Sequence, residues 1–191
     1  MNETGFKLFC SFPHQNTYQE RDIEDAVSEA SKFISRFRSP SSNANNKLSD
    51  VEVEEAKHLA NRLRACVEKF YPDQPITTFP SFEGCGVVSH CQGDLLVGHT
   101  LLEVKAGFRG FRSSDFKQVL VYLTLNHAAG SPLKITSLGL VNPRLGSIYF
   151  TTVDEVLKQV AGLSAVETFE EIADFLCEDS RVGALQHSFP G

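Results

Sequence analysis

The stretch that decides the fold runs from Gly84 to Asn126 and reads GCGVVSHCQGDLLVGHTLLEVKAGFRGFRSSDFKQVLVYLTLN. At its centre lie two short apolar runs, residues 94–97 and 100–105, which only the dipeptide Gly98-His99 separates. A two-residue connection that begins with glycine is typical of a type II′ turn between antiparallel strands. The pattern therefore predicts a β-hairpin in the middle of the chain.

The register of this hairpin brings charged residues together. The two-residue turn pairs Val97 with Thr100, and counting back along both strands makes Asp94 face Glu103. Strand alternation then places Lys105 on the same face as the two carboxylates. Directly opposed side chains lie about 5 Å apart, and like charges in that position destabilise a sheet. A divalent cation between the carboxylates would remove the repulsion, and their oxygen atoms suit Mg²⁺ or Mn²⁺.

These residues match a known motif. Asp94, followed after eight residues by Glu103-Val104-Lys105, resembles the core of the PD-(D/E)XK nuclease superfamily, with glycine before the aspartate in place of proline. Downstream, Gln118 and Tyr122 have the QxxxY spacing of its RecB-like branch. The resemblance covers roughly residues 50–152. It implies metal-dependent hydrolysis of phosphodiester bonds in DNA.

The resemblance also implies a role for each residue. The residues expected to act in catalysis are Asp94, Glu103, Lys105 and Gln118. The residues expected to hold Mg²⁺ or Mn²⁺ are Asp94, Glu103, Val104 through its carbonyl oxygen, and Glu52, or as second candidate Glu55, from the helix before the sheet. The residues expected to contact the substrate are Tyr122, Arg109, Arg112 and Lys117. The cation would lower the pKa of a bound water, and the ammonium of Lys105 would hold that water in line.

The same hairpin residues could also have purely structural roles. Asp94 follows a glycine, which is a common turn pair. Glu103 and Lys105 are also typical of an exposed edge strand that is protected by charge. The leucines beside them argue against an exposed edge, so the metal site is the stronger interpretation.

The helical residues have alternatives of their own. Glu52 lies three residues after Ser49, which is the spacing of a helix capping box. Gln118 lies three residues after Asp115 and has the same competing role in the next helix. Tyr122, taken by itself, is typical of a core residue.

The charge distribution bears on the substrate. The chain of 191 residues has a net charge of −6, whereas surfaces that bind nucleic acid are usually basic. Between residues 104 and 117, one acid, Asp115, is accompanied by the four bases Lys105, Arg109, Arg112 and Lys117. We therefore expect a phosphate track beside the site, and a protein partner that supplies a motor or target recognition.

The composition disfavours several other classes of protein. No run approaches 18 apolar residues, so no membrane span is expected, and the first residues lack the pattern of a signal peptide. Five scattered cysteines, an odd number, are expected to remain reduced in the cytoplasm. Cys85, His90 and Cys91 form a weak pattern for zinc, and buried neutral thiols are the stronger interpretation of these cysteines. The four-cysteine pattern of the iron–sulfur RecB-like nucleases is absent from the sequence.

The rest of the chain alternates between helical and strand patterns. Residues 1–20 are expected to be irregular or to hold a short strand. Helices are predicted over residues 22–37, 50–70, 115–126, 153–160 and 165–177. Strands are predicted over residues 84–89, 94–97, 100–105, 135–141 and 147–152.

This order of elements predicts an α/β sandwich of restriction-endonuclease type, with a central mixed sheet of about five strands flanked by helices. Residues 1–46 would form an N-terminal arm and helix with a flexible linker, and residues 47–191 the nuclease-like domain. Candidate settings are DNA repair, mobile elements and anti-phage defence. The alternatives are a catalytically silent subunit of the same fold that binds nucleic acid or acts as a scaffold, and a nuclease that acts on RNA.

Overall fold

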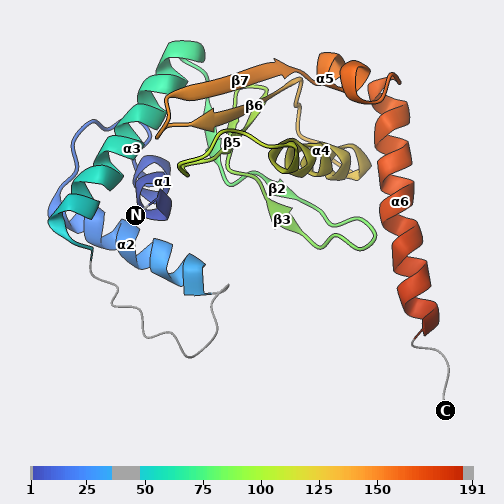
Figure 1. The fold of residues 1–191 in the computed structure, drawn as a ribbon, viewed down its shortest axis with the longest axis horizontal. Coiled ribbons are helices and arrows are strands. Elements are labelled where there is room, and N and C mark those ends of the chain that lie inside the picture. Colours follow the sequence, from blue (N-terminus) through green and yellow to red (C-terminus); the bar gives the residue numbers. More distant parts are fainter. Residues whose placement is uncertain (1, 36–47, 187–191) are drawn as a thin grey trace. The chain divides into compact units, whose positions relative to one another are not determined.

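The structure of the chain, a computed structural model, describes residues 2–35 and 48–186, with side chains up to residue 178 (Figure 1). Contacts divide the chain into two compact units. Unit 1 takes the segments Met1–Gln74, Lys105–Gly110 and Val141–Ser147. Unit 2 takes the segments Pro75–Val104, Phe111–Leu140 and Ile148–Gly191. The linker predicted over residues 39–46, and with it the predicted domain boundary after residue 46, lies outside the described residues.

Unit 1 contains the first three helices of the chain. They are α1 (Asn2–Ser11), α2 (Glu20–Ser35) and α3 (Asp50–Phe70), coloured from blue to teal in Figure 1. The expectation of an irregular segment or strand at the N-terminus was wrong, because α1 is helical and packs against both α2 and α3. Close packing explains the difference. A Cβ atom at Gly5 would lie 2.8 Å from the carbonyl oxygen of Ala56, so glycine permits a close approach of α1 to α3 although it disfavours a helix by itself.

Helix α3 has the predicted bounds and the predicted N-terminus. The backbone N–H of Glu52 donates to Ser49 Oγ at 3.4 Å, and Glu52 Oε2 accepts from the backbone N–H of Ser49 at 2.9 Å. This reciprocal pair satisfies two backbone donors that the first turn of a helix leaves open. The buried face of α3 consists of Ala56, Leu59, Ala60, Leu63, Arg64 and Val67.

A five-stranded mixed sheet carries the order β1-β4-β5-β6-β7. Its strands are β1 (Ile76–Thr78), β4 (Leu95–Val97), β5 (Thr100–Val104), β6 (Ser137–Asn142) and β7 (Ser147–Thr152). Strand β4 pairs antiparallel with both β1 and β5. The predicted α/β class, with a mixed sheet flanked by helices and an N-terminal helix, is confirmed.

The strand predicted over residues 84–89 does not belong to this sheet. Cys85 and Val88 instead form an isolated bridge around a tight turn, in which Gly86 has a φ of 59°. This left-handed conformation, which glycine adopts readily, reverses the chain where the two adjacent valines suggested an extended strand. The sheet edge is taken by β1, and a separate two-stranded sheet consists of β2 (Ser81–Phe82) and β3 (Cys91–Gln92).

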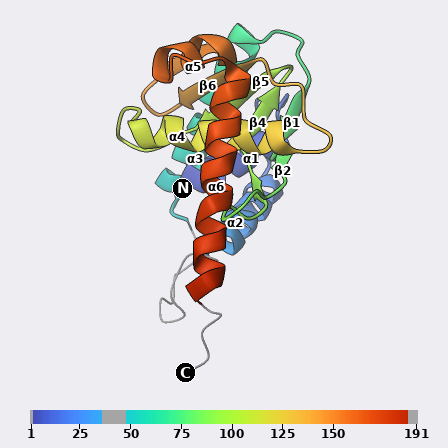
Figure 2. The ribbon, with the colours of Figure 1, turned by 90° about the vertical axis from the view of Figure 1, so that its right-hand side faces the viewer.

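Three helices complete unit 2, namely α4 (Ser113–Ala128), α5 (Val153–Val160) and α6 (Ala165–Gln186). Figure 2 shows α6 crossing in front of α4, with which it is in contact. Helix α5 has its predicted bounds, α4 is two residues longer than predicted at each end, and α6 continues beyond Cys177. Together with the sheet they enclose one core, formed by Phe82, Leu101, Val119, Tyr122, Leu123, Leu125, Leu138, Leu140, Val153, Val156, Leu157 and Phe169. Among the described residues, no helix combines the length and the apolar character that crossing a membrane requires.

Candidate active site

The β4–β5 hairpin has the register that the sequence predicts. Its cross-strand pairs are Leu95 with Leu102, Leu96 with Leu101, and Val97 with Thr100. Gly98 has a φ of 57°, as the first position of a type II′ turn requires. Asp94 and Glu103 lie one position beyond the last of these pairs, Asp94 directly before β4 and Glu103 within β5. Continued by one residue, the register would place the two carboxylates opposite each other on one face of the sheet.

Two hydrogen bonds fix the position of Asp94. Its Oδ2 atom accepts from the backbone N–H of Val104 at 2.7 Å, across the hairpin. Its carbonyl oxygen accepts from the backbone N–H of Phe79 at 2.9 Å. A hydrogen bond to a carboxylate is stronger than one between neutral groups. The side chain of Asp94 is thus held against β5, at the position next to Glu103.

Glu103 is a buried carboxylate, with 4% of its surface exposed. It lies two residues after Leu101, so it shares the face of β5 that packs into the core with α4. A buried charge costs several kcal/mol unless neighbouring groups compensate it. An acid that must be kept ionised for function is one reason to retain such a residue in a core.

The helix pair Gln118 and Tyr122 lies close to these carboxylates. Gln118 Nε2 donates to the hydroxyl oxygen of Tyr122 at 2.7 Å. Burial is the main cause that raises the pKa of Tyr122 to about 12; the negative charges of Glu103 and Asp94 act in the same direction, and the hydrogen bond from Gln118 opposes the shift. The QxxxY residues thus share one locality with the acidic pair. At neutral pH the phenol is a neutral hydroxyl that can donate as well as accept.

Lys105 is the first residue of the segment that belongs to unit 1. Its backbone N–H donates to the carbonyl oxygen of Val141 at 2.8 Å, and its side chain is partly buried. Lys105 directly follows β5, so its backbone lies one residue after Val104 and two residues after Glu103.

The three basic residues expected to touch substrate lie in different units. Arg112 and Lys117 are exposed residues of unit 2 at the start of α4. The backbone N–H of Arg112 donates to Asp115 Oδ2 at 2.9 Å. Arg112 is therefore the N-cap of α4, and Asp115, rather than Gln118, occupies the third helical position. The predicted cap was therefore placed three residues too late, and Gln118 is available for Tyr122. Arg109 lies in unit 1, where its guanidinium donates to the carbonyl oxygen of Gly110 at 3.0 Å.

Glu52 performs the structural role that the sequence offered as an alternative. Hydrogen bonds from the backbone and side chain of Ser49 lower the pKa of its exposed carboxyl group. The second candidate, Glu55, forms an ion pair with Arg144. Both glutamates belong to unit 1 and already have partners there, so a metal ligand from α3 stays a prediction.

The donor set on the hairpin fits a hard cation. Among the described residues, no group of three or more His, Cys, Asp and Glu side chains is placed to hold a metal ion. Two opposed carboxylates with a backbone carbonyl are nevertheless a sufficient set for Mg²⁺, which commonly binds through one or two carboxylates and keeps several waters. The chemistry of Asp94, Glu103 and the Val104 carbonyl therefore fits Mg²⁺ or Mn²⁺ better than it fits zinc.

The residues that suggested zinc have other partners. Cys85 Sγ lies 3.7 Å from Cys177 Sγ, and His90 Nε2 lies 2.6 Å from Ser81 Oγ. Burial raises the pKa of Cys85 and of Cys91, which disfavours the thiolate that a zinc ion requires. These contacts leave the hairpin carboxylates as the better candidate site.

Sequence reasoning missed residues that support the site and the segment after it. Phe82 stacks on Tyr122, with ring centroids 5.2 Å apart and an interplanar angle of 9°. Asn142 and Arg144, which lie between the strands predicted over residues 135–141 and 147–152, hold the segment 105–110 by hydrogen bonds. A usable signal existed for Asn142, because an amide at the end of an apolar strand must find partners when it is buried. No comparable signal marked Phe82.

Comparison of the chain with protein-family models, with curated proteins and with solved structures finds no match.

Proposed function

We propose that this protein is a Mg²⁺- or Mn²⁺-dependent nuclease that hydrolyses phosphodiester bonds in DNA. The observation that carries the proposal is that Asp94 is hydrogen-bonded across the hairpin to Val104, directly beside the buried carboxylate of Glu103. The resemblance of Asp94, Glu103-Val104-Lys105 and the QxxxY residues to the PD-(D/E)XK nucleases supports it independently of the structure.

In this proposal each residue acts through its ordinary chemistry. Asp94, Glu103 and the Val104 carbonyl hold the cation. Bound there, the cation supplies positive charge at the scissile phosphate and acidifies a water. Lys105, a compact ammonium with three donors, orients the attacking water. Tyr122 keeps its proton at neutral pH because its pKa is about 12, so it acts by orienting groups rather than as a base.

In this proposal basic side chains and the amide of Gln118 hold the substrate. Arg112 and Lys117 at the start of α4, with Arg109, contact phosphates, and Gln118 donates near the cation or a phosphate. The net charge of −6 opposes binding of nucleic acid by the chain as a whole. We therefore include in the proposal a cytoplasmic protein partner that supplies a motor or target recognition.

Cleavage assays test the proposal directly. Linear duplex, circular duplex and single-stranded DNA are incubated with Mg²⁺, Mn²⁺ or EDTA, and products are resolved on denaturing gels. We expect metal-dependent cleavage by the wild type and loss of cleavage in Lys105→Ala and Asp94→Asn. Lys158→Ala, which changes an exposed lysine on α5, is the matched control, and circular dichroism checks that each variant is folded.

The outcomes separate a missing partner from a wrong assignment. If the isolated chain does not cleave, calorimetry measures Mg²⁺ and Mn²⁺ binding to the wild type and to Asp94→Ala. Binding that this substitution removes would point to an absent partner or to a catalytically silent subunit. Absence of any Mg²⁺ or Mn²⁺ binding would reject the nuclease assignment.

A further inference from the structure

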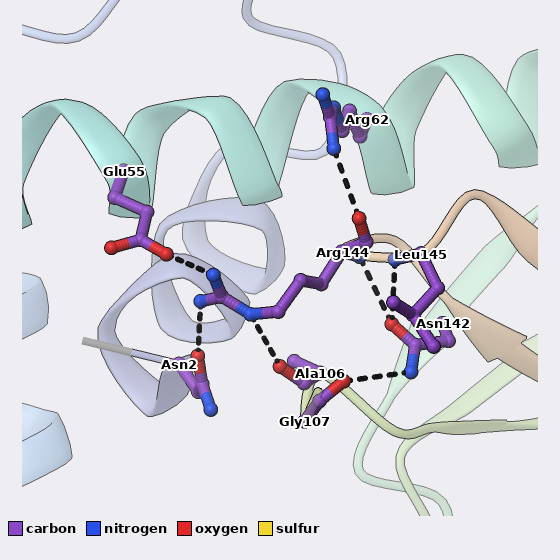
Figure 3. Close-up of polar contacts among 8 residues, drawn as sticks. All are labelled: Asn2, Glu55, Arg62, Ala106, Gly107, Asn142, Arg144 and Leu145. Atoms are coloured by element: carbon purple, nitrogen blue, oxygen red, sulfur yellow. Dashed lines mark hydrogen bonds and ion pairs between the residues drawn. The ribbon is translucent and has the colours of Figure 1, made fainter. Parts of the chain in front are cut away.

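The segment Lys105–Gly110 has a backbone that is held by neighbouring side chains of unit 1. Asn142 Nδ2 donates to the carbonyl oxygen of Gly107 at 2.9 Å and to that of Arg109 at 3.1 Å. Asn142 is itself buried, and its Oδ1 accepts from the backbone N–H of Arg144 at 3.0 Å. One amide therefore ties the loop after the site lysine to the β6–β7 turn, as Figure 3 shows.

Arg144 supports the same loop from the next position of that turn. Its Nε donates to the carbonyl oxygen of Ala106 at 2.9 Å, and its Nη2 donates to Asn2 Oδ1 at 2.6 Å. Its Nη1 forms an ion pair with Glu55, and only 9% of the arginine side chain is exposed. Figure 3 shows the guanidinium extended between these three partners. Arg144 is thus a fixed group with little freedom to move.

The fixed loop presents an aromatic ring to solvent. Phe108 is 78% exposed, the largest value for an aromatic side chain among the described residues. The guanidinium carbon of Arg144 lies 4.2 Å from the centroid of its ring. Phe150 and Phe175, the next most exposed rings, lie on a strand and a helix, whereas Phe108 lies on a loop that several hydrogen bonds hold in place. The guanidinium of Arg144 covers one face of the ring, and the large exposed fraction of the side chain leaves the rest of Phe108 accessible to a ligand.

We propose that Phe108 is a stacking platform for an unpaired base of a single-stranded DNA substrate. This inference rests on the proposed function, because the phosphate to be cleaved would lie at Lys105. Phe108 lies three positions after Lys105, a reach of at most about 10 Å, which is the rise of roughly three stacked nucleotides at about 3.4 Å each. The platform would therefore bind a base within about three nucleotides of the scissile phosphate.

The surroundings of Phe108 favour an unpaired nucleic acid over other ligands. Bases inside a duplex have both faces covered by their neighbours, so an exposed ring can stack only on a single strand or an extruded base. Arg109 follows directly and Lys105 precedes by three residues, and both supply charge for the backbone phosphates. One exposed ring is much smaller than the apolar patch of several hundred Å² that marks a protein interface.

The sequence offers a direct probe, because it contains no tryptophan. Phe108→Trp would place a single indole on the loop, and its fluorescence is titrated with single-stranded oligothymidylate and with blunt duplex DNA in EDTA. We expect quenching by the single strand and little by the duplex. Phe175→Trp, at a position that is 63% exposed on α6, is the matched control and should not be quenched.

Affinity and cleavage then separate this inference from the proposed function. Phe108→Ala should weaken binding of the single strand by about 5- to 150-fold, the range for one lost base–aromatic stack, while Phe108→Tyr should retain it. Quenching of Phe108→Trp by the single strand, together with absence of any Mg²⁺ or Mn²⁺ binding to the wild type, would support the platform and reject the nuclease. Normal cleavage and affinity in Phe108→Ala, without quenching in Phe108→Trp, would reject the platform and leave the nuclease standing. If the wild type is a dimer that Phe108→Ala dissociates, and DNA does not quench Phe108→Trp, the ring forms a contact between two copies of the chain. That result would overturn the inference.

Discussion

Neutralising one carboxylate of the hairpin should remove the response of the fold to Mg²⁺. The change is Asp94→Asn, which keeps the size of the side chain and an oxygen that can accept from the backbone N–H of Val104. That hydrogen bond is 2.7 Å long, so the variant should retain the hairpin. What it loses is one of the two negative charges that would hold the cation.

The magnitude follows from the usual spacing of directly opposed residues in a sheet. Two like charges about 5 Å apart repel each other by about 3 kcal/mol at an effective dielectric constant of about 20. Removing one charge relieves this repulsion but weakens the bond to Val104 by about 1 kcal/mol. In EDTA the variant should therefore unfold within about 2 kcal/mol of the wild type. For a Mg²⁺ dissociation constant of about 1 mM, about 10 mM Mg²⁺ should stabilise the wild type by about 1.4 kcal/mol.

The assay is urea denaturation in EDTA and in Mg²⁺, for the wild type, Asp94→Asn and Glu103→Gln. Glu83→Gln, which neutralises an exposed carboxylate of the same unit, is the control and should respond to Mg²⁺ like the wild type. Equal stabilisation by Mg²⁺ in the wild type and in both hairpin variants would refute the reasoning, because the cation would then act elsewhere on the protein.

Further predictions concern the fold around the site. Gly86→Ala should lower the free energy of unfolding by more than about 1 kcal/mol, because φ is 59° and the new Cβ would lie 2.1 Å from the carbonyl oxygen of Leu176. Urea denaturation measures this loss, and an unchanged midpoint would contradict the prediction. The pKa of Tyr122 is raised from 10.0 to about 12, so the contribution of its neutral phenol to the free energy of unfolding is complete below pH 10 and is lost as the pH rises through about 12. In denaturation experiments at several alkaline pH values, the free energy of unfolding should therefore fall less steeply with pH in Tyr122→Phe than in the wild type. Ser49→Ala should cost about 1 kcal/mol at neutral pH. Because Ser49 lowers the pKa of Glu52, this difference should shrink as the pH falls through the acidic range, and a pH-independent loss would argue against the reciprocal cap.

The hairpin could be predicted from sequence because its determinants are local. A glycine at the turn fixes the length of the connection, and the length fixes the register of β4 and β5. The opposition of Asp94 and Glu103 follows from that register alone. The cap of α3 was predictable for the same reason, because Ser49 and Glu52 contact each other within a single turn of helix.

The errors lie where distant parts of the chain decide the structure. Helix α1 depends on the close approach of Gly5 to α3, and no pattern within residues 1–20 encodes it. The turn at Gly86 is fixed by α6, since the backbone N–H of Val87 donates to the carbonyl oxygen of Leu176 at 3.0 Å. That contact spans about half of the chain, so the local valine pair pointed to a strand instead. Propensity was overridden by packing in both cases.

The ligand count at the hairpin limits how the proposed nuclease can bind its cation. Magnesium requires six ligands in a nearly octahedral arrangement, and Asp94, Glu103 and the Val104 carbonyl provide about three oxygen atoms. Glu52 is engaged by Ser49 at the start of α3, so water and substrate oxygens must supply the rest. Such a site binds weakly when the substrate is absent and more tightly when a phosphate completes the coordination. Cation and DNA should therefore bind cooperatively, and by reciprocity Mg²⁺ should raise the affinity for DNA by the same factor as DNA raises the affinity for Mg²⁺.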